Sequence, residues 1–390
     1  MANDAWAGWQ REVAGAVVRS KPLFAERAAE PPEELREALT AALGVPGLRA
    51  DPDVRVEDTF RRDGLEGADL SWTCGYGPRT RAWLLRPDGA GEPLPGVLAL
   101  FEHGGVKMLG REKLSDGAGL EGPVALAASA HREACSGGRA WAEELARRGV
   151  AVLVHDAFGF GSRRLPAAEA SARTVRAALA QGSLAREEAA EASGDPAASS
   201  PAVDPEALHA GFEGEAAKAA GVLGTSWAGL LAAEDLFALD VLGSLPWVDG
   251  ARLAAAGMSG GGARAGVLRV LAPQLRATAI VAMMSTLPEL MAGHADAHSW
   301  TWLSPGLGTV GDWPSVVASW TSNPLLVQYG LADHLFPRSG MERAHEQIRR
   351  RFEHFGDASN YTGAFYPSGH VFTAAMQNEA FGWLASRLGP

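Results

Sequence analysis

Residues 251–272 read ARLAAAGMSGGGARAGVLRVLA, and this stretch decides the fold. An apolar run ends in the segment GMSGG, residues 257–261, and a helix-like pattern begins directly after it. A serine between a strand and a helix, with small residues two positions before and after it, is the pattern of a nucleophile elbow, a sharp turn that exposes the hydroxyl. We therefore predict that Ser259 is a nucleophile at the end of a strand.

The five-residue pattern alone carries little weight, because the chain contains 47 glycines. In a chain of this composition a G-x-S-x-G match is expected by chance on the order of a few tenths of a time, so the flanking elements must support it. The alternative is a glycine-rich turn with an idle serine. A helix that begins just after Ser259 favours the first interpretation, since its N-terminus can stabilise a developing negative charge.

Short apolar runs on both sides of this segment predict further strands, and several are apolar throughout, as strands buried on both faces are. The predicted strands cover residues 80–85, 97–101, 150–154, 253–256, 279–283, 325–327 and 364–366. Helix-like stretches lie between the later strands, at residues 139–148, 227–242, 261–271 and 340–355. This alternation predicts an α/β fold with a mostly parallel central sheet and helices on both faces.

The 390 residues are predicted to form one catalytic domain over residues 51–390, preceded by a helical extension over residues 1–50. The extension begins with apolar residues at helical spacing, namely Trp6, Trp9, Val13 and Val17. A second helix is expected over residues 33–43, ended by Gly44 and Pro46. Exposed aromatic rings on the first helix would form an apolar patch that must be buried. We therefore expect this helix to pack on the body of the protein or, in a homo-oligomer, on a second copy of the chain.

Residues 165–225 are rich in alanine, glutamate and serine and show no strand pattern, with a break expected at residues 193–204. The segment follows the strand that ends at Asp156, and we predict it to be a helical insertion. Two interpretations stay open. It is either a surface segment without function or a helical cap over the active site, where loops and lids shape specificity.

A serine hydroxyl needs a neighbouring base to remove its proton. Where a nucleophile elbow occurs, the chain order is nucleophile, acid and histidine, and the histidine follows the last strand. His370 meets this condition, because it follows the apolar segment GAFYP. A closing helix is expected after it, with a stripe of Phe372, Met376, Ala380, Leu384 and Leu388. We predict that His370 is the general base.

The acid should lie between Ser259 and His370, on a loop that leaves a strand, because its carboxylate must stay ionised and fix the tautomer of the imidazole. Asp333 meets this condition in LLVQYGLADHLFP, residues 325–337. Asp357 is the alternative, although nothing resembling a strand precedes it. His334, next to Asp333, is expected to be a structural or pocket residue.

An oxyanion hole requires two backbone N–H groups aimed at one point. One is expected from Gly260, the residue after the nucleophile, and the other from the loop after the strand at residues 97–101. That loop reads Glu-His-Gly-Gly and ends in Gly104 and Gly105, whose lack of a side chain lets the backbone approach a substrate. Gly105 is preferred and Gly104 is the alternative, while His103 is expected to brace the loop.

The composition excludes several classes of function. A formal net charge of −11 argues against a surface for nucleic acid or anionic lipid, which requires clustered Lys and Arg. No apolar run reaches the roughly 18 residues that a membrane span needs, and the first residues lack the order of a signal peptide, so a cytoplasmic protein is expected. The two cysteines, Cys74 and Cys135, are too few for a disulfide framework and are interpreted as ordinary thiols.

Several segments together resemble the dienelactone-hydrolase and acetyl-xylan-esterase-like branch of the α/β-hydrolase superfamily. The resemblance covers most of the chain, and its segments follow in the expected order. They are EELREALTAALGVP (33–46), PGVLALFEHGG (95–105), GREKL (110–114), HDAFGFGSRR (155–164), LPWVDGARLAAAGMSGGG (245–262) and PLLVQYGLADHLFP (324–337). The first of these, a helical lead-in, is the more specific sign, because other hydrolases of this superfamily generally lack it.

The resemblance implies carboxyl-ester hydrolysis through an acyl-enzyme, with a small-molecule ester as substrate and with no metal or organic cofactor. It also implies that Asp156 and Arg163 lie near the pocket and hold its loops, or else form a plain structural ion pair. The chain departs from the better-known carbohydrate esterases at residues 102–105, where EHGG replaces an HG motif with an aromatic residue. It departs from dienelactone hydrolases because Ser259 stands in place of a cysteine.

Residues 285–308 should lie over the active-site edge of the sheet, because they follow a predicted strand. Trp300 and Trp302 are candidates for an aromatic wall of the pocket, with ordinary burial as the alternative. His294 and His298 have an H-x3-H spacing that would place two imidazoles on one helical face, with Asp296 between them. Since no third ligand is evident, we expect no metal there.

Three functions remain open from the sequence. The first is an esterase that uses the predicted triad. The second keeps the triad and changes the reaction to acyl transfer, carbon–carbon cleavage or peptide cleavage, because neither the fold nor the triad fixes the substrate. The third is a non-catalytic binding protein with the same fold, which the intact set of predicted residues disfavours.

Overall fold

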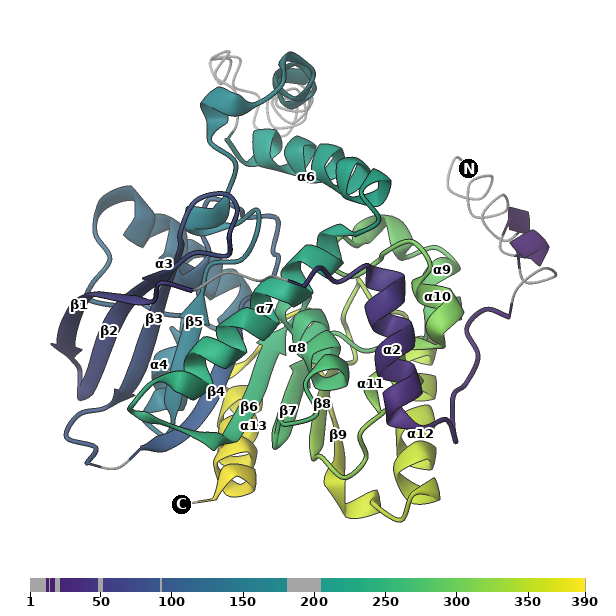
Figure 1. Cartoon of the computed structure of the whole chain (residues 1–390). Coiled ribbons are helices and arrows are strands. Elements are labelled where there is room, and N and C mark those ends of the chain that lie inside the picture. Colours follow the sequence, from purple (N-terminus) through teal and green to yellow (C-terminus); the bar gives the residue numbers. More distant parts are fainter. Residues whose placement is uncertain are drawn as a thin grey trace.

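The computed structural model describes most of the chain, namely residues 12–13, 15–17, 22–47, 52–91, 93–180 and 205–389 (Figure 1). Trp6 and Trp9 of the predicted first helix lie outside these ranges, as do residues 181–204 of the predicted insertion. The structure describes the catalytic domain expected over residues 51–390 except for residues 51, 92, 181–204 and 390.

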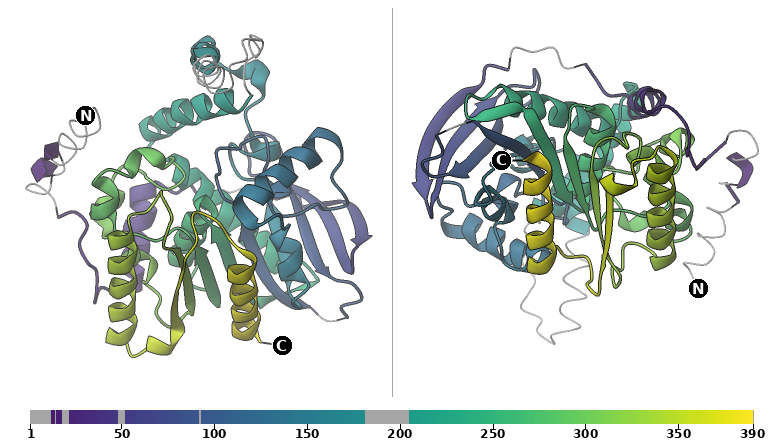
Figure 2. Two further views of the ribbon diagram at one scale, coloured as in Figure 1. Left: turned by 180° about the vertical axis from the view of Figure 1, so that it is seen from behind. Right: turned by 90° about the horizontal axis from the view of Figure 1, so that it is seen from below.

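A nine-stranded sheet forms the centre of the molecule (Figures 1 and 2). Its strands are β1 (Arg55–Arg62), β2 (Leu65–Trp72), β3 (Thr80–Pro87), β4 (Leu94–Leu100), β5 (Ala151–His155), β6 (Val248–Met258), β7 (Ala277–Val281), β8 (Leu325–Gly330) and β9 (Tyr361–Tyr366). They lie in the order β1-β2-β3-β5-β4-β6-β7-β8-β9. The pairs from β1 to β5 are antiparallel, and every pair from β5 to β9 is parallel. The predicted mostly parallel sheet is confirmed.

Helices cover both faces of the sheet, as Figure 2 shows from behind and from below. They are α2 (Pro32–Leu43), α3 (Gly122–Ser136), α4 (Trp141–Ala146), α6 (Pro205–Val222), α7 (Trp227–Ser244), α8 (Gly260–Leu271), α9 (Leu287–Met291), α10 (Leu307–Val310), α11 (Trp313–Val317), α12 (Arg338–His354) and α13 (Ala374–Leu388). One apolar cluster joins α2, α7, α8, α11 and α12 to one face, and a second joins α4 and α13 to the other. The central strands are therefore buried on both sides, which explains their continuous apolar runs.

The expected strands are all present, as are the helices expected at residues 33–43, 139–148, 227–242, 261–271 and 340–355, with ends that differ by a few residues. The hairpin of β1 and β2 and the helix α3 were not predicted. Strand β1 reads RVEDTFRR and is mostly exposed, so it carries no apolar run, and its turn at Asp63 and Gly64 has φ angles of +51° and +77°. Tight hairpins favour such positive angles. The closing helix α13 buries its predicted stripe.

Helix α6 belongs to the predicted insertion and lies above the start of α7, at the top of the molecule in Figure 1. Within the described ranges, no single helix is both long enough and apolar enough to cross a membrane. Helices α6 and α7 pass that criterion only as a pair, by length and composition, with a bend of 88° at the break between them.

Candidate active site

Ser259 lies in the turn between β6 and α8, with φ of +52° and ψ of −123°. A residue other than glycine held at such angles costs about 1–3 kcal/mol and persists only where its surroundings enforce it. Two glycines allow the turn: a Cβ on Gly257 would lie 2.3 Å from the carbonyl of Gly261, and one on Gly261 would lie 2.0 Å from the carbonyl oxygen of Leu100. The sequence pattern at residues 257–261 thus follows from the close passage of two backbones.

The three predicted triad residues come together. Nε2 of His370 lies 2.7 Å from Oγ of Ser259, and Nδ1 of His370 lies 2.7 Å from Oδ2 of Asp333. The other carboxylate oxygen of Asp333 accepts a hydrogen bond from the N–H of Leu335 at 2.9 Å. Asp357, the alternative acid, is remote from this chain of contacts and accepts from the hydroxyl of Thr321.

Each side chain of the triad is supplied by a strand end. Ser259 follows β6, Asp333 follows β8 and His370 follows β9, so parallel neighbours place all three at one edge of the sheet. The two later loops are tied together, because the N–H of Ala332 donates to the carbonyl of Ser368 at 2.9 Å. With Asp333 at Nδ1, the imidazole carries its proton there and leaves Nε2 free to accept the serine proton.

The candidate oxyanion loop, residues 102–105, lies against the nucleophile elbow, since a Cβ on Gly260 would be 3.0 Å from the backbone N of His103. The N–H of Gly105 is already used, because it donates to Nδ1 of His103 at 3.1 Å. Within the described part of the chain, the N–H groups of Gly104 and Gly260 have no hydrogen-bond partner. The geometry therefore favours Gly104 over Gly105 as the second donor, the reverse of the order expected from the sequence.

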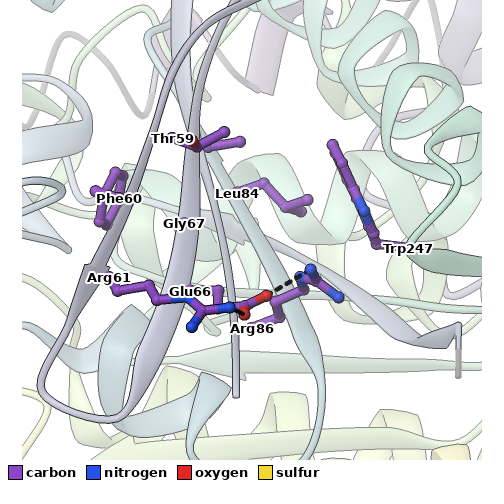
Figure 3. Close-up of a pocket in the computed structure, with 9 residues that line it drawn as sticks. Thr59, Phe60, Arg61, Glu66, Gly67, Leu84, Arg86 and Trp247 are labelled. Atoms are coloured by element: carbon purple, nitrogen blue, oxygen red, sulfur yellow. Dashed lines mark hydrogen bonds and ion pairs between the residues drawn. The ribbon is translucent and has the colours of Figure 1, made fainter. Parts of the chain in front are cut away.

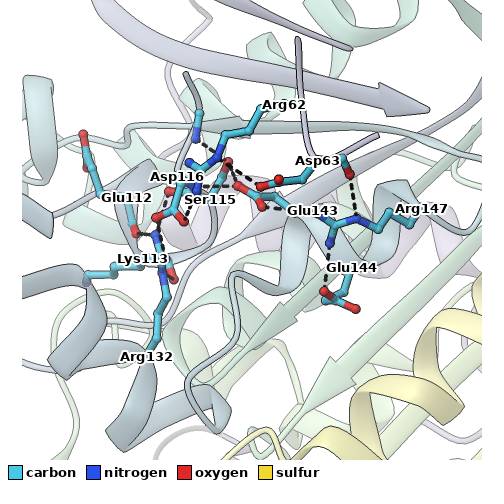
Figure 4. Close-up of polar contacts among 11 residues, drawn as sticks. Arg62, Asp63, Glu112, Lys113, Ser115, Asp116, Arg132, Glu143, Glu144 and Arg147 are labelled. Carbon is cyan, nitrogen blue, oxygen red and sulfur yellow. Dashed lines mark hydrogen bonds and ion pairs between the residues drawn. The ribbon is translucent and has the colours of Figure 1, made fainter. Parts of the chain in front are cut away.

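Lys113 holds the oxyanion loop from the interior. Figure 4 shows the contacts that Arg132 makes with Lys113 and Asp116. Its buried Nζ donates to the carbonyl oxygens of Glu102 and His103, each at 2.9 Å. The His103 carbonyl and the Gly104 N–H belong to the same peptide group. Because that group is planar and trans, the N–H of Gly104 points away from Lys113. Arg132 of α3 pairs with Asp116 at 2.6 Å and donates to the carbonyl of Lys113 at 3.2 Å. Burial lowers the pKa of Lys113 to about 8.

His103 braces the loop, as predicted. Its Nδ1 accepts from the N–H of Gly105, and its Nε2 lies 3.0 Å from Oε2 of Glu213 on α6. Burial lowers the pKa of His103, although Glu213 raises it in part. Nothing in the sequence pairs Glu213 with His103, because 110 residues separate them and glutamates on a helix are by default a solvated face.

A cavity of about 330 Å³ opens at Ser259. Its lining is uncharged apart from histidines and comprises His103, Gly104, Gly105, Ser259, Gly260, Met283, Ala297, His298, Ser299, Thr301, Trp302, Leu335 and His370. Trp302 thus forms part of the pocket, as expected. Trp300 does not: its side chain is 44% exposed and lines a separate apolar pocket beside α9 and α10. The aromatic wall is therefore a single ring.

The expectation for Asp156 and Arg163 needs correction, because neither lines the cavity at Ser259. They also do not pair with each other. Asp156 accepts from the N–H of Arg111 at 2.8 Å and of Ser162 at 2.9 Å. Arg163 pairs at 2.5 Å with Glu234 of α7 in the interior. Both side chains hold loops outside the pocket and are structural.

The H-x3-H pattern does not lie on one helical face. Helix α9 ends at Met291, and residues Ala295–Ala297 form only a short 3-10 turn between His294 and His298. His298 lines the pocket and its Nε2 lies 3.2 Å from the carbonyl of Leu335, while burial lowers its pKa. Among the described residues, the side chains with metal-like spacing are Glu102, His131 and Cys135, where His131 and Glu102 are 2.5 Å apart and share a hydrogen bond.

A second pocket of about 330 Å³ lies beside the β1–β3 hairpins (Figure 3). There, Arg86 pairs with Glu66 and stacks over the ring of Trp247 at 5.5 Å. Trp247 directly precedes β6, whose opposite end leads to Ser259. This pocket therefore lies at the far edge of the sheet from the triad and is not the candidate active site.

An open, mostly parallel sheet covered by helices, with a serine on a strained turn after a central strand, defines the α/β-hydrolase fold. The structures similar to this chain have that fold. A protein of Bacteroides fragilis NCTC 9343, provisionally named an acetyl xylan esterase, is 16% identical, with 91% of this chain and 81% of that one covered and a TM-score of 0.63. A glucuronoyl esterase from Solibacter usitatus is 12% identical, with 93% of each chain covered and a TM-score of 0.62.

An acetyl xylan esterase from Thermoanaerobacterium sp. JW/SL YS485 is 15% identical, with 94% of this chain and 97% of that one covered and a TM-score of 0.50. No protein-family model matches the chain, and no curated protein matches it. At these identities the likeness shows the fold, which confirms the α/β-hydrolase prediction and the resemblance to acetyl xylan esterases at that level.

Proposed function

We propose that this protein is a serine hydrolase that cleaves carboxylic esters through an acyl-enzyme. The observation that carries the proposal is the unbroken chain of contacts from Asp333 through His370 to Ser259. The choice of an ester as substrate is supported by the similar structures, which are named as carboxylic ester hydrolases.

In the proposed reaction, Oγ of Ser259 attacks the ester carbonyl while Nε2 of His370 takes the serine proton. The carbonyl oxygen becomes negative and accepts hydrogen bonds from the N–H groups of Gly260 and Gly104. His370 then gives its proton to the leaving alcohol, and the acyl group stays on Ser259. Water attacks this acyl-enzyme with His370 again as base, and the acid product leaves. Asp333 keeps the proton on Nδ1 throughout.

The pocket lining supports an uncharged substrate. Neither Arg nor Lys is among the residues that line the cavity. His298 is buried there and its pKa is lowered, so it is neutral near pH 7. A carboxylate carried by the substrate would lose its water without gaining a cationic partner, which is costly. We propose esters with a compact, neutral acyl group, for which a cavity of about 330 Å³ leaves room.

The test uses purified wild-type protein, Ser259→Ala and the control Ser322→Ala, which changes an exposed serine away from the site. We expect the wild type and the control to hydrolyse 4-nitrophenyl acetate equally and to gain the mass of a fluorophosphonate label. Ser259→Ala should lose both properties. Hydrolysis by Ser259→Ala at the wild-type rate would refute the proposal.

A second assay addresses the substrate class. 4-Nitrophenyl hemisuccinate carries a free carboxylate on its acyl group, whereas acetylated neutral sugars and simple alkyl acetates carry a small neutral acyl group. The proposal expects higher kcat/KM for the neutral acetates than for esters that bear a free carboxylate. A preference for carboxylate-bearing esters would contradict the uncharged pocket without affecting the role of Ser259.

A further inference from the structure

Glu213, on helix α6 of the insertion, is buried, and its carboxylate contacts the oxyanion loop. Its Oε2 lies 3.0 Å from Nε2 of His103 and also accepts from the ammonium of Lys107. Its Oε1 accepts from the backbone N–H of Trp300 at 3.0 Å. Three donors from two different loops therefore converge on the two oxygens of one side chain.

We propose that Glu213 is a positioning residue for the oxyanion hole, acting through His103. The proposal rests on the serine esterase function proposed above. No feature of the triad requires this carboxylate, because it touches neither Ser259 nor His370 among the contacts of the described residues. Its effect is on the geometry of residues 103–105.

The first step of the argument is the tautomer of His103. A carboxylate only accepts hydrogen bonds, so the imidazole must carry its proton on Nε2, facing Glu213. Nδ1 is then an acceptor, and it receives the N–H of Gly105 at 3.1 Å. Loss of the carboxylate would permit the other tautomer, in which N–H of His103 would face N–H of Gly105. That pair of donors cannot bond, and the loop would have to turn.

The second step concerns the peptide groups of the loop. Gly104 and Gly105 have φ angles of +55° and +69°, in the left-handed region where glycine has alternatives. Lys113 fixes the carbonyl of His103 from the interior, and His103 fixes the N–H of Gly105 from the side of α6. The unpaired N–H of Gly104 lies between these two anchors. Its direction therefore depends on both.

The third step is the charge of Glu213. Although burial raises its pKa, the hydrogen bond from His103 and the positive charge of Lys107 lower the pKa to about 2. The side chain of Lys107 is itself buried, against the rings of Phe160 and Trp227 at 4.2 and 4.9 Å. A buried ammonium of this kind needs a paired anion. Glu213 is thus ionised wherever the enzyme would be assayed.

The same carboxylate also holds the opposite wall of the pocket. The backbone N–H of Trp300 donates a hydrogen bond to Glu213 and lies in the turn that carries Ser299, Thr301 and Trp302. These three residues line the cavity. One residue of α6 therefore links the oxyanion loop to the pocket wall. Under this proposal helix α6 has a function at the site, while the cap over residues 165–225 stays a prediction.

The main variant for the test is Glu213→Gln. Its amide cannot accept from all three donors, because its NH2 must face at least one of them. We expect kcat for 4-nitrophenyl acetate to fall about ten- to hundredfold, less than the about 10²- to 10³-fold loss on removing an oxyanion donor outright. KM should stay within about threefold, and binding of a trifluoromethyl ketone, which forms an oxyanion adduct, should weaken by the same factor as kcat.

The matched control is Glu215→Gln on the same helix, where the carboxylate is exposed and accepts from Ser171. It should match the wild type in every assay. Because Glu213→Gln leaves Lys107 buried without its anion, a second variant, Glu213→Gln with Lys107→Met, removes the charge pair as a unit. It should fold with a melting temperature near that of the wild type and keep the loss in kcat.

A double-mutant cycle tests whether Glu213 acts through His103. In a His103→Ala background, Glu213→Gln should change kcat by less than about threefold further, since the shared route is already lost. Independent, multiplying losses would overturn the proposal, as would a folded Glu213→Gln enzyme with wild-type kcat. In either case inactivity of Ser259→Ala would still support the esterase function, so the two failures are distinguishable.

Discussion

Replacing Asp333 by asparagine tests the tautomer on which the proposed catalysis depends. The orientation of the new amide can be worked out from the structure. Oδ1 of Asp333 accepts from the N–H of Leu335 at 2.9 Å, so the amide oxygen must keep this position. The NH2 group then faces Nδ1 of His370 at the 2.7 Å contact now made by Oδ2. It can only donate there, which drives the imidazole proton to Nε2, facing Ser259.

In that tautomer Nε2 cannot accept the serine proton. In a serine protease triad the equivalent change lowers kcat about 10⁴-fold, and at 1.36 kcal/mol per tenfold this corresponds to about 5.4 kcal/mol of transition-state stabilisation. We expect a loss of this size for Asp333→Asn, with an unchanged fold by circular dichroism. The assay is single-turnover acylation with 4-nitrophenyl acetate. The control is Asp357→Asn, which alters the alternative acid.

The prediction is refuted if Asp333→Asn acylates within tenfold of the wild-type rate at pH 7. It is also refuted if Asp357→Asn produces the loss. Either result would mean that His370 obtains its tautomer from a group other than Asp333, even though Asp333 lies within hydrogen-bonding distance of its Nδ1.

Three further predictions concern the elbow, the pocket and acid stability. Gly261→Ala should destabilise the fold by at least about 1–3 kcal/mol in urea unfolding, because its Cβ would lie 2.0 Å from a backbone oxygen of Leu100. Trp302→Ala should raise KM and cost about 3–5 kcal/mol of stability, whereas Trp300→Ala should leave KM unchanged. The pKa of Glu213 falls on folding from 4.5 to about 2, so its stabilisation is complete above 4.5 and is lost as the pH falls toward 2. The urea midpoint of the wild type should therefore fall more steeply than that of Glu213→Gln in this window, and parallel curves would contradict the assignment.

The triad was predictable because each of its members follows a strand. An apolar run is a local signal, and in a parallel sheet the carboxyl ends of strands meet at one edge, so sequence order alone brings Ser259, Asp333 and His370 together. The elbow adds a second local signal, since the glycines around Ser259 report a close passage of two backbones. Local patterns of this kind survive without any knowledge of long-range contacts.

The contacts around the triad were not predictable in the same way. Glu213 reaches His103 across 110 residues, from a helix whose pattern differs little from that of a solvated one. Arg163 could have paired with any nearby acid, and the structure gives it Glu234. Which of two tryptophans two positions apart lines the pocket at Ser259 depends on the direction of one turn, and Trp300 lines a different pocket. These choices are made by tertiary packing, which residue types alone do not encode.

The preference between Gly104 and Gly105 shows the same limit at the scale of one peptide group. Both residues satisfy the requirement for positive φ, so the sequence treats them alike. The difference comes from the side chain of His103, which takes up the N–H of Gly105. Only a structure reveals which of two neighbouring donors is already bonded.

Two histidines of the site are governed by one chemical rule. A carboxylate at one ring nitrogen fixes the proton there and makes the other nitrogen an acceptor, of the serine hydroxyl at His370 and of the Gly105 N–H at His103. The consequences differ because His370 exchanges its proton with the substrate, whereas His103 only holds a loop. Loss of Asp333 should therefore abolish proton transfer itself, while loss of Glu213 should leave proton transfer intact and weaken only the stabilisation of the oxyanion. The pH at which activity rises should accordingly be the same in Glu213→Gln as in the wild type, and a shift in that pH would mean that the two histidines are coupled.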